Sequence, residues 1–258
     1  MSAASMQTSV IVVGGLSLRV QVQGEGAPVL LLNGLGQPLE SWDPFVVALS
    51  GRRVIRFDAP GVGESVMPLL PPSITSLASI AAAVLDEMGE TNVDVVGFSL
   101  GGAIAQQFAH DYPSRVRHLV LIATSCGLGT TLRRWESGDV LTAPSWSASL
   151  TGVFSASWQA LAIVNWSSIP FLGGVTQPSL VVSGRHDKVT PPSNGRVLAS
   201  RIPDARLVIL DADHEMLQSP VADELVQVVE RFLRGTEAVG PVPIEGHPAI
   251  LHFAINFA

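Results

Sequence analysis

The chain is poor in cysteine, in charged residues and in basic residues. Cys126 is the single cysteine among 258 residues, which excludes an intramolecular disulfide and a metal site built from several cysteines. Charged residues make up 14% of the chain and the formal net charge is -7, so the composition provides no basic surface for nucleic acid or an anionic membrane. These shortages argue against polyanionic partners.

Signals for export and for membrane insertion are also missing. Residues 1–8 carry no positive charge and no apolar core, so they do not form a secretory signal. No uncharged stretch is apolar enough to cross a bilayer. We therefore expect a cytoplasmic protein without an integral membrane segment, with export by another route left open. Because 47% of the residues are hydrophobic, the chain is able to bury the core of one main domain.

Apolar runs of strand length alternate with segments of helical period along most of the chain. This alternation predicts a mostly parallel, eight-stranded sheet with helices on both faces. Functional sites in such sheets lie at the carboxyl ends of the strands. The expected strands are 10–13, 16–22, 29–32, 53–57, 93–98, 119–123, 179–183 and 207–210, and the expected helices are 39–49, 73–88, 103–109, 193–201 and 220–233.

A glycine-rich turn joins the strand at 93–98 to the helical segment at 103–109. Its sequence, Gly97-Phe98-Ser99-Leu100-Gly101-Gly102, has the G-x-S-x-G pattern of a nucleophile elbow. A serine in a strained backbone conformation leaves no room for side chains two residues before or after it, which accounts for the two flanking glycines. A helix-capping serine is the alternative. The strand, turn and helix context favours Ser99 as a nucleophile.

Two residues that follow later strands supply the partners that a serine nucleophile requires. Asp187 follows the strand at 179–183, and His214 follows the strand at 207–210. In a catalytic triad the histidine takes the proton of the serine, and the carboxylate fixes the tautomer of the histidine and stabilises its cation. The chain order Ser, Asp, His is the order expected of such a triad in an α/β sheet of this kind.

Other residues compete for these two roles. Asp187 could be an ordinary turn residue before Thr190. We expect His110 and His118 at a surface or a helix end, and His186 as a solvated neighbour of Asp187. Three other acids close to His214 in the sequence could bond its ring: Asp211, Asp213 and Glu215. The histidines that compete with His214 for the role of base are His110, His118, His186, His247 and His252.

Catalysis also requires donors for the oxyanion of the reaction. Asn33-Gly34-Leu35-Gly36 leaves the strand at 29–32 at the same sheet edge, where glycines let the backbone approach a substrate. The backbone N–H groups of Leu35 and Leu100 are the best candidates. A plain turn after a strand is the alternative.

These motifs together resemble the α/β-hydrolase superfamily over about residues 10–235. The resemblance rests on the elbow, the Asp187 loop, His214, Asn33-Gly34-Leu35-Gly36 and Asp58-Ala59-Pro60-Gly61-Val62-Gly63. Four stretches look, more narrowly, like intracellular medium-chain-length polyhydroxyalkanoate depolymerases: 33–36, 58–63, 101–109 and Gln177-Pro178. Many relatives carry histidine where this chain has Asn33, and the depolymerase-like branch is similar in carrying asparagine. Three features depart from these patterns. Leu100 stands where that branch usually has tryptophan, the segment between Cys126 and Pro178 looks shorter than the lid of that branch, and Asp213 stands where the superfamily favours glycine.

The resemblance implies a hydrolase core at 1–126 and 178–235 with a short inserted lid at 127–177. From 140 to 177 the chain has no charged residue and no histidine. Such a lid above the elbow would supply apolar walls for a hydrophobic acyl group, whereas packing of the same residues against the core is the alternative. Four of the five tryptophans lie in this region: Trp135, Trp146, Trp158 and Trp166.

The tail at 236–258 fits no element of the superfamily. It docks on the domain, pairs with another subunit or stays without fixed structure, so a homo-oligomer is one of the open alternatives.

The sequence as a whole predicts a serine hydrolase that cleaves carboxylic esters through an acyl-enzyme. The class includes esterases, lipases and polyhydroxyalkanoate depolymerase-like enzymes, whose substrate is a small or polymeric ester. No metal and no organic cofactor are implied. The alternatives are a cofactor-free perhydrolase or haloperoxidase, a carbon-carbon bond hydrolase on the same fold, and a non-catalytic ligand receptor.

Overall fold

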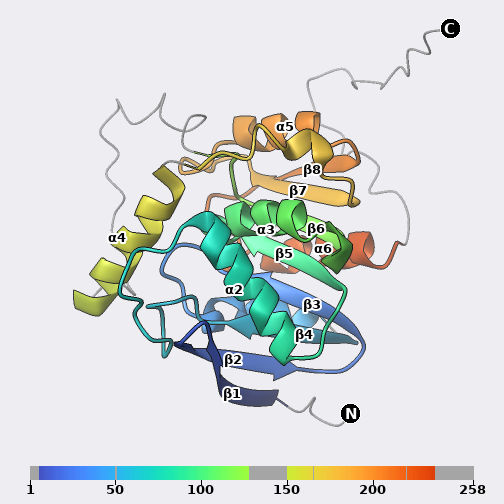
Figure 1. Ribbon diagram of the computed structural model, residues 1–258. Helices are drawn as coiled ribbons and strands as arrows, with labels where there is room; N and C mark the ends of the chain where they lie inside the picture. The colour runs from blue at the N-terminus through green and yellow to red at the C-terminus, as the bar shows by residue number, and fades with distance from the viewer. Residues whose placement is uncertain (1–5, 50, 128–149, 165, 219, 236–258) are drawn as a thin grey trace, which may run out of the picture.

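One eight-stranded sheet organises the protein (Figure 1). The computed structural model describes residues 6–49, 51–127, 150–164, 166–218 and 220–235. The strand order is β1-β2-β4-β3-β5-β6-β7-β8, which agrees with the expected sheet. The strands are β1 (Met6–Val13), β2 (Leu16–Gln23), β3 (Ala27–Leu32), β4 (Arg52–Phe57), β5 (Val93–Phe98), β6 (Val116–Ile122), β7 (Ser179–Gly184) and β8 (Ala205–Leu210).

The sheet is antiparallel at one edge and parallel elsewhere. β1 pairs with β2, and β2 pairs with β4, in antiparallel register. The tight turn between β1 and β2 uses Gly14 and Gly15, whose φ values of 55° and 82° suit the two-residue hairpin expected there. Pairing is parallel from β4 to β8. Every residue of β5 and of β7 is buried, because a parallel sheet is covered on both faces.

Helices cover both faces of this sheet (Figure 1). The helices α2 (Ile74–Glu87), α3 (Leu100–Asp111) and α5 (Pro192–Arg201) share one hydrophobic cluster with the sheet, and α1 (Asp43–Ala48) and α6 (Ala222–Leu233) share the other. The helix α4 (Leu150–Val164) lies at one end of the sheet, where its Ala162 and Ile163 pack against the first of these clusters. Among the described helices, none is both long and apolar enough to cross a membrane.

Two predicted features differ from the structure or lie outside it. The helix expected at 39–49 is a 3₁₀ turn at Leu39–Trp42 followed by the short helix α1. Pro44 has no backbone N–H and therefore fits the first turn of a helix rather than its interior. Residues 128–149 of the predicted lid and the tail at 236–258 lie outside the described residues, so the domain boundaries and the role of the tail stay predictions.

A buried carboxylate joins the amino-terminal ends of the central strands. Asp94 of β5 is fully buried and contacts Arg52 at 2.5 Å, Arg117 at 2.8 Å and the Nδ1 atom of His118 at 2.8 Å. Burial alone would oppose ionisation, but the hydrogen bonds from His118 and Arg117 outweigh it, so the pKa of Asp94 lies below its usual range. His118 therefore bonds a buried carboxylate, whereas the sequence favoured a surface or helix-end role.

The ion pairs of Asp94 make the free energy of unfolding depend on pH in acidic solution. Because the pKa of Asp94 is lower in the folded protein than in the unfolded chain, where it is about 3.9, ionised Asp94 stabilises the fold at any pH above about 3.9. This stabilisation is lost as the pH falls from there through the pKa of Asp94 in the folded protein. We expect Asp94→Asn to cost about 3 kcal/mol at pH 7, since it breaks the buried pair with Arg52, which keeps only the longer contact to Glu230 at 3.4 Å. We also expect it to flatten the loss of stability below about pH 4. Urea unfolding at several pH values measures both effects. The exposed Asp204→Asn is the control, and an unchanged acid slope in Asp94→Asn would contradict the assignment.

Candidate active site

Ser99 lies on a strained turn between β5 and α3. Its φ of 52° and ψ of -116° place a non-glycine residue in a region that side chains rarely adopt. A side chain at Gly97 would collide with the backbone of Gly101, and one at Gly101 would collide with the carbonyl oxygen of Leu32. Ser99 occupies the N-cap position of α3, yet its side chain makes no capping hydrogen bond. The capping alternative is therefore wrong, and the hydroxyl is directed elsewhere.

The structure brings together the three side chains that the sequence selected. The Oγ atom of Ser99 lies 3.0 Å from the Nε2 atom of His214. The Nδ1 atom of His214 lies 2.8 Å from the Oδ2 atom of Asp187. Both distances are hydrogen bonds, so a continuous chain runs from hydroxyl to imidazole to carboxylate. A chain of this kind is able to move a proton from the hydroxyl to the imidazole.

Asp187 is both a turn residue and the partner of the histidine. Its Oδ1 atom accepts hydrogen bonds from the backbone N–H groups of Val189 at 2.8 Å and Thr190 at 2.7 Å. Its Oδ2 atom faces His214 and also accepts from the Thr190 hydroxyl at 2.7 Å. The two interpretations of Asp187 therefore do not exclude each other. Sequence reasoning gave Thr190 no role, although a hydroxyl three residues after an aspartate in a turn is a common signal.

The residues that competed with this set have other partners or lie elsewhere. His186 is exposed and lies 2.8 Å from Asp211, as a solvated neighbour would. His110 stacks on Phe171 with ring centroids 4.3 Å apart. The Asp213 carboxylate accepts from the backbone of Glu215. His247 and His252 lie outside the described residues.

The predicted oxyanion donors lie in the loop after β3 and at the start of α3. The Asn33 side chain donates to the carbonyl oxygens of Gln37 at 2.9 Å and Pro38 at 2.6 Å, which fixes the loop as a tight turn. Leu100 is the first residue of α3, so its backbone N–H has no acceptor within the helix. No acceptor for the N–H of Leu35 is found among the described residues. Both N–H groups are therefore without an acceptor among the described residues, so they stay the candidate oxyanion donors.

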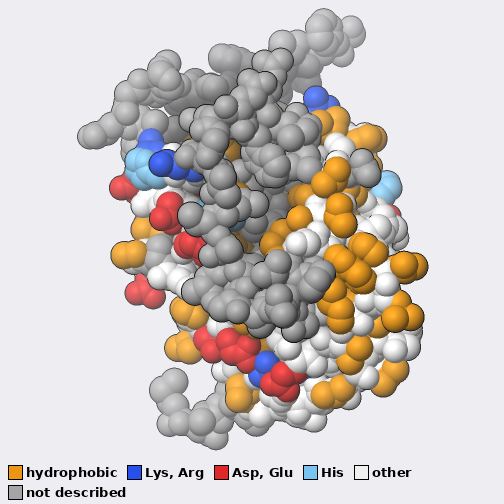
Figure 2. Space-filling model, turned by 90° about the vertical axis from the view of Figure 1, so that its left-hand side faces the viewer, with side chains coloured by type: hydrophobic (Ala, Val, Ile, Leu, Met, Phe, Trp, Pro, Cys, Tyr) orange, Lys and Arg blue, Asp and Glu red, His pale blue; other side chains and the backbone are white. Residues whose placement is uncertain are grey.

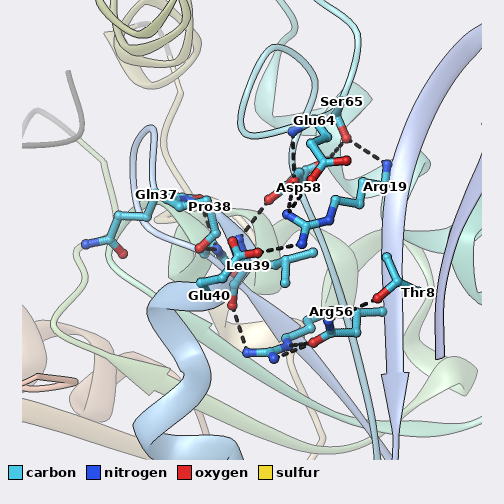
Figure 3. Close-up of polar contacts among 12 residues, drawn as sticks. Thr8, Arg19, Gln37, Pro38, Leu39, Glu40, Arg56, Asp58, Glu64 and Ser65 are labelled. Carbon is cyan, nitrogen blue, oxygen red and sulfur yellow. Dashed lines mark hydrogen bonds and ion pairs between the residues drawn. The ribbon is translucent and has the colours of Figure 1, made fainter. Parts of the chain in front are cut away.

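A buried carboxylate behind this loop ties it to the next one (Figure 3). Asp58 accepts from the backbone N–H of Leu39 at 2.8 Å and from that of Glu64 at 3.1 Å. Arg19 approaches the same carboxylate at 3.4 Å. Burial raises the pKa of Asp58, and the two backbone hydrogen bonds offset only part of that effect. Asp58 thus has a structural role that the sequence motif alone did not reveal.

A small cavity adjoins the elbow and the loop after β3. Its lining includes Leu77 of α2, Leu100 and Ile104 of α3, and Gln159 of α4. The free volume of about 10 Å³ holds about one water molecule. An acyl chain would therefore need a shift of the surrounding side chains or of α4 in order to enter.

The end of the molecule that carries α4 is partly apolar at its surface. Figure 2 views this end, and hydrophobic side chains gather along one side of it. Leu161 and Val164 of α4 are exposed, as are Leu69 and Leu70 in the loop before α2. The lid tryptophans do not behave alike. Trp166 packs against the core and donates to Gln107 at 2.8 Å, Trp158 is half-buried, and Trp135 and Trp146 lie outside the described residues.

Comparison with known proteins identifies the class to which this fold and site belong. A model of the alpha/beta hydrolase fold matches residues 27–149 and 128–218. The chain therefore belongs to the α/β hydrolase fold family.

Within that family the chain is similar to several characterised hydrolases. It is 36% identical over 254 residues to a poly(3-hydroxyalkanoate) depolymerase from Ectopseudomonas oleovorans, and the match covers 85% of this chain and 89% of that protein. It is 29% identical to a 2-hydroxymuconate semialdehyde hydrolase from Pseudomonas putida, over 89% of this chain and 95% of that protein. The crystal structure of the enol-lactonase from Burkholderia xenovorans LB400 matches with a TM-score of 0.76 at 26% identity, over 88% of this chain and all of that chain.

Proposed function

We propose that this protein is a serine hydrolase that cleaves carboxylic esters. The observation that carries the proposal is the hydrogen-bonded chain from Ser99 through His214 to Asp187 at the carboxyl ends of β5, β7 and β8. The depolymerase relative supports an ester substrate, either small or polymeric. The strained backbone of Ser99, and the Leu35 and Leu100 N–H groups for which no acceptor is found among the described residues, support the same proposal.

The reaction follows from the geometry in two halves. In the first, the Oγ atom of Ser99 attacks the ester carbonyl while the Nε2 atom of His214 takes its proton, and the Leu35 and Leu100 N–H groups bind the oxyanion. The imidazolium then gives the proton to the leaving alcohol, which leaves an acyl-serine. In the second half His214 takes a proton from water, the resulting hydroxide attacks the acyl carbonyl, and His214 returns that proton to the Oγ atom of Ser99 as the C–O bond breaks and the carboxylic acid departs. Asp187 holds the Nδ1 proton of His214 throughout.

The acyl group that we propose is hydrophobic. The cavity beside Leu100 is lined mainly by apolar side chains, and α4 belongs to the segment 127–177 that we assign as the lid. We expect kcat/KM for p-nitrophenyl esters to rise from acetate to octanoate, because each buried methylene adds about 0.8 kcal/mol of burial energy. Emulsified polyhydroxyalkanoate extends the same series to a polymer. Rates that peak at acetate and collapse by octanoate would sink this part of the proposal.

A second candidate is hydrolysis of a carbon-carbon bond. The similarity to the semialdehyde hydrolase favours testing it, because the same fold and triad serve both chemistries. Ring-cleavage products, lactones and acyl esters compared in one panel decide between the two reactions. Labelling by a fluorophosphonate probe separates either enzyme from a non-catalytic receptor, since the probe reacts with an activated serine.

A further inference from the structure

An open hollow lies at the amino-terminal ends of the central strands, at the edge of the sheet opposite Ser99. Its volume is about 640 Å³, which falls in the range of sites that hold small molecules. Among the described residues that line it, every ionisable one is basic. These are Arg52 at the start of β4, Arg117 and His118 at the start of β6, and Arg234 just after α6. The hollow is therefore suited to a negatively charged ligand.

Two carboxylates hold these arginines in place without lining the hollow themselves. Asp94 is fully buried and contacts Arg52 and Arg117. Glu230 of α6 is also buried, and it lies 3.4 Å from the Nε atom of Arg52 and 2.6 Å from that of Arg234. Three arginines thus share two carboxylates, so this group keeps a positive charge that neither acid balances.

Two of the arginines keep a nitrogen that is available to a ligand. Arg52 uses its Nη1 and Nε atoms on Asp94 and Glu230. Arg117 uses its Nε atom on Asp94 and its Nη2 atom on the carbonyl oxygen of Pro28 at 3.2 Å. In the described part of the chain no acceptor is found for Nη2 of Arg52 or Nη1 of Arg117, and neither nitrogen is buried. Because the existing contacts already fix both side chains, a ligand has little side-chain entropy to remove.

The chemistry of these donors defines the ligand. A guanidinium group recognises carboxylates and phosphates through paired, charge-assisted hydrogen bonds. The hydrogen bond to Asp94 raises the pKa of Arg117, so its charge is permanent under any ordinary condition. The volume of the hollow is about twenty times that of a water molecule in the liquid, which leaves room for an organic group beside the anion.

We propose that this hollow is a second ligand site, which binds a small organic anion through a carboxylate or phosphate group. The Nη2 atom of Arg52 and the Nη1 atom of Arg117 donate to the anion, and the half-exposed Arg234 adds positive charge. Asp94 and Ser99 are five positions apart along β5, or about 16 Å at the rise of a strand. The ligand therefore does not compete with a substrate at Ser99, and the site does not depend on the proposed ester hydrolysis.

The test is titration calorimetry of the wild-type full chain at constant ionic strength. The probes are phenyl phosphate and benzoate, which pair the same ring with the two acidic groups, and phenol is the uncharged control. We expect saturable binding of at least one anion at one site per chain and no binding of phenol. Binding of either anion supports the proposal, and the tighter one identifies the preferred group.

Two substitutions test the arginines separately. We expect Arg117→Gln and Arg234→Gln each to weaken binding of the anion about tenfold, because each removes a positive charge and hydrogen-bond donors. Arg234→Gln leaves the contacts of Asp94 intact, so it tests the site even if Arg117→Gln unfolds. Arg196→Gln is the matched control, since Arg196 is an exposed arginine of α5 outside the lining, and it should bind as wild type does. Thermal unfolding checks the fold of each variant.

A fluorophosphonate label on Ser99 separates the hollow from the elbow. The labelled protein should bind the anion as tightly as the unlabelled one, and a label that blocks binding would overturn the proposal. Absence of saturable binding, unchanged affinity in both arginine variants, or an equal loss in Arg196→Gln would also overturn it. A protein that binds the anion as expected but is not labelled contradicts the proposed function alone.

Discussion

Replacing Ser99 by alanine should reduce ester hydrolysis by at least about 10⁴-fold and leave the fold intact. We propose that the Oγ atom of Ser99 attacks the carbonyl, and among the described residues its hydrogen-bond partner is the Nε2 atom of His214 at 3.0 Å. Because the side chain does not cap α3, its loss removes no helix-stabilising interaction. Steady-state rates with a chromogenic ester measure the loss of activity, and circular dichroism with thermal unfolding checks the fold.

The matched control for this prediction is Ser193→Ala. Ser193 is an exposed serine near the start of α5, outside the hydrogen-bonded chain at the candidate site. We expect it to retain wild-type rates. A Ser99→Ala protein that keeps most of its esterase activity would end the assignment of Ser99 as nucleophile.

Asp187→Asn should lower kcat by roughly 10⁴-fold with a much smaller change in KM. The backbone N–H groups of Val189 and Thr190 require an acceptor, so they will hold the amide oxygen of the new asparagine. Its NH₂ group then faces His214 and donates to Nδ1. The histidine is forced into the tautomer whose proton sits on Nε2, and that atom is no longer able to accept the proton of Ser99.

Two neighbouring acids provide the comparison. Asp211 pairs with exposed His186, and Asp213 accepts from the backbone of Glu215, so neither carboxylate bonds the candidate base. We expect Asp211→Asn and Asp213→Asn to change kcat less than twofold. If Asp187→Asn kept more than about a tenth of the wild-type rate, or if Asp213→Asn matched its loss, the carboxylate would have to be reassigned.

Much of this site could be predicted because its residues lie where strands end. In a parallel sheet those ends share one edge, so a serine, an aspartate and a histidine that each follow a strand are brought close without knowledge of the packing. The glycines at 97 and 101 supported Ser99 as the nucleophile, because their spacing around it is what a strained turn requires on steric grounds. The structure places Ser99 within hydrogen-bonding distance of His214, and His214 within hydrogen-bonding distance of Asp187.

The residues that could not be predicted act across loops or between layers. Gln159 meets Gly36 across a separation of 123 residues, and no local pattern signals that pair. Asp58 was recognised as part of a motif, but its hydrogen bonds to Leu39 and Glu64 depend on how two loops pack. His118 contacts Asp94 because β5 and β6 are neighbours in the sheet. The sequence shows these two strands as apolar runs and does not indicate a polar contact between them.

The close approach of Gly101 to the carbonyl of Leu32 has a consequence for altering the substrate range. Saturation mutagenesis at 97 or 101 would return mostly inactive clones, because any side chain there pushes the nucleophile away from the oxyanion loop. Leu100, between them, already carries a side chain and lines the cavity beside the elbow. A focused library at 100, 104 and 159, with both glycines held constant, would search acyl preference while keeping the reaction centre fixed.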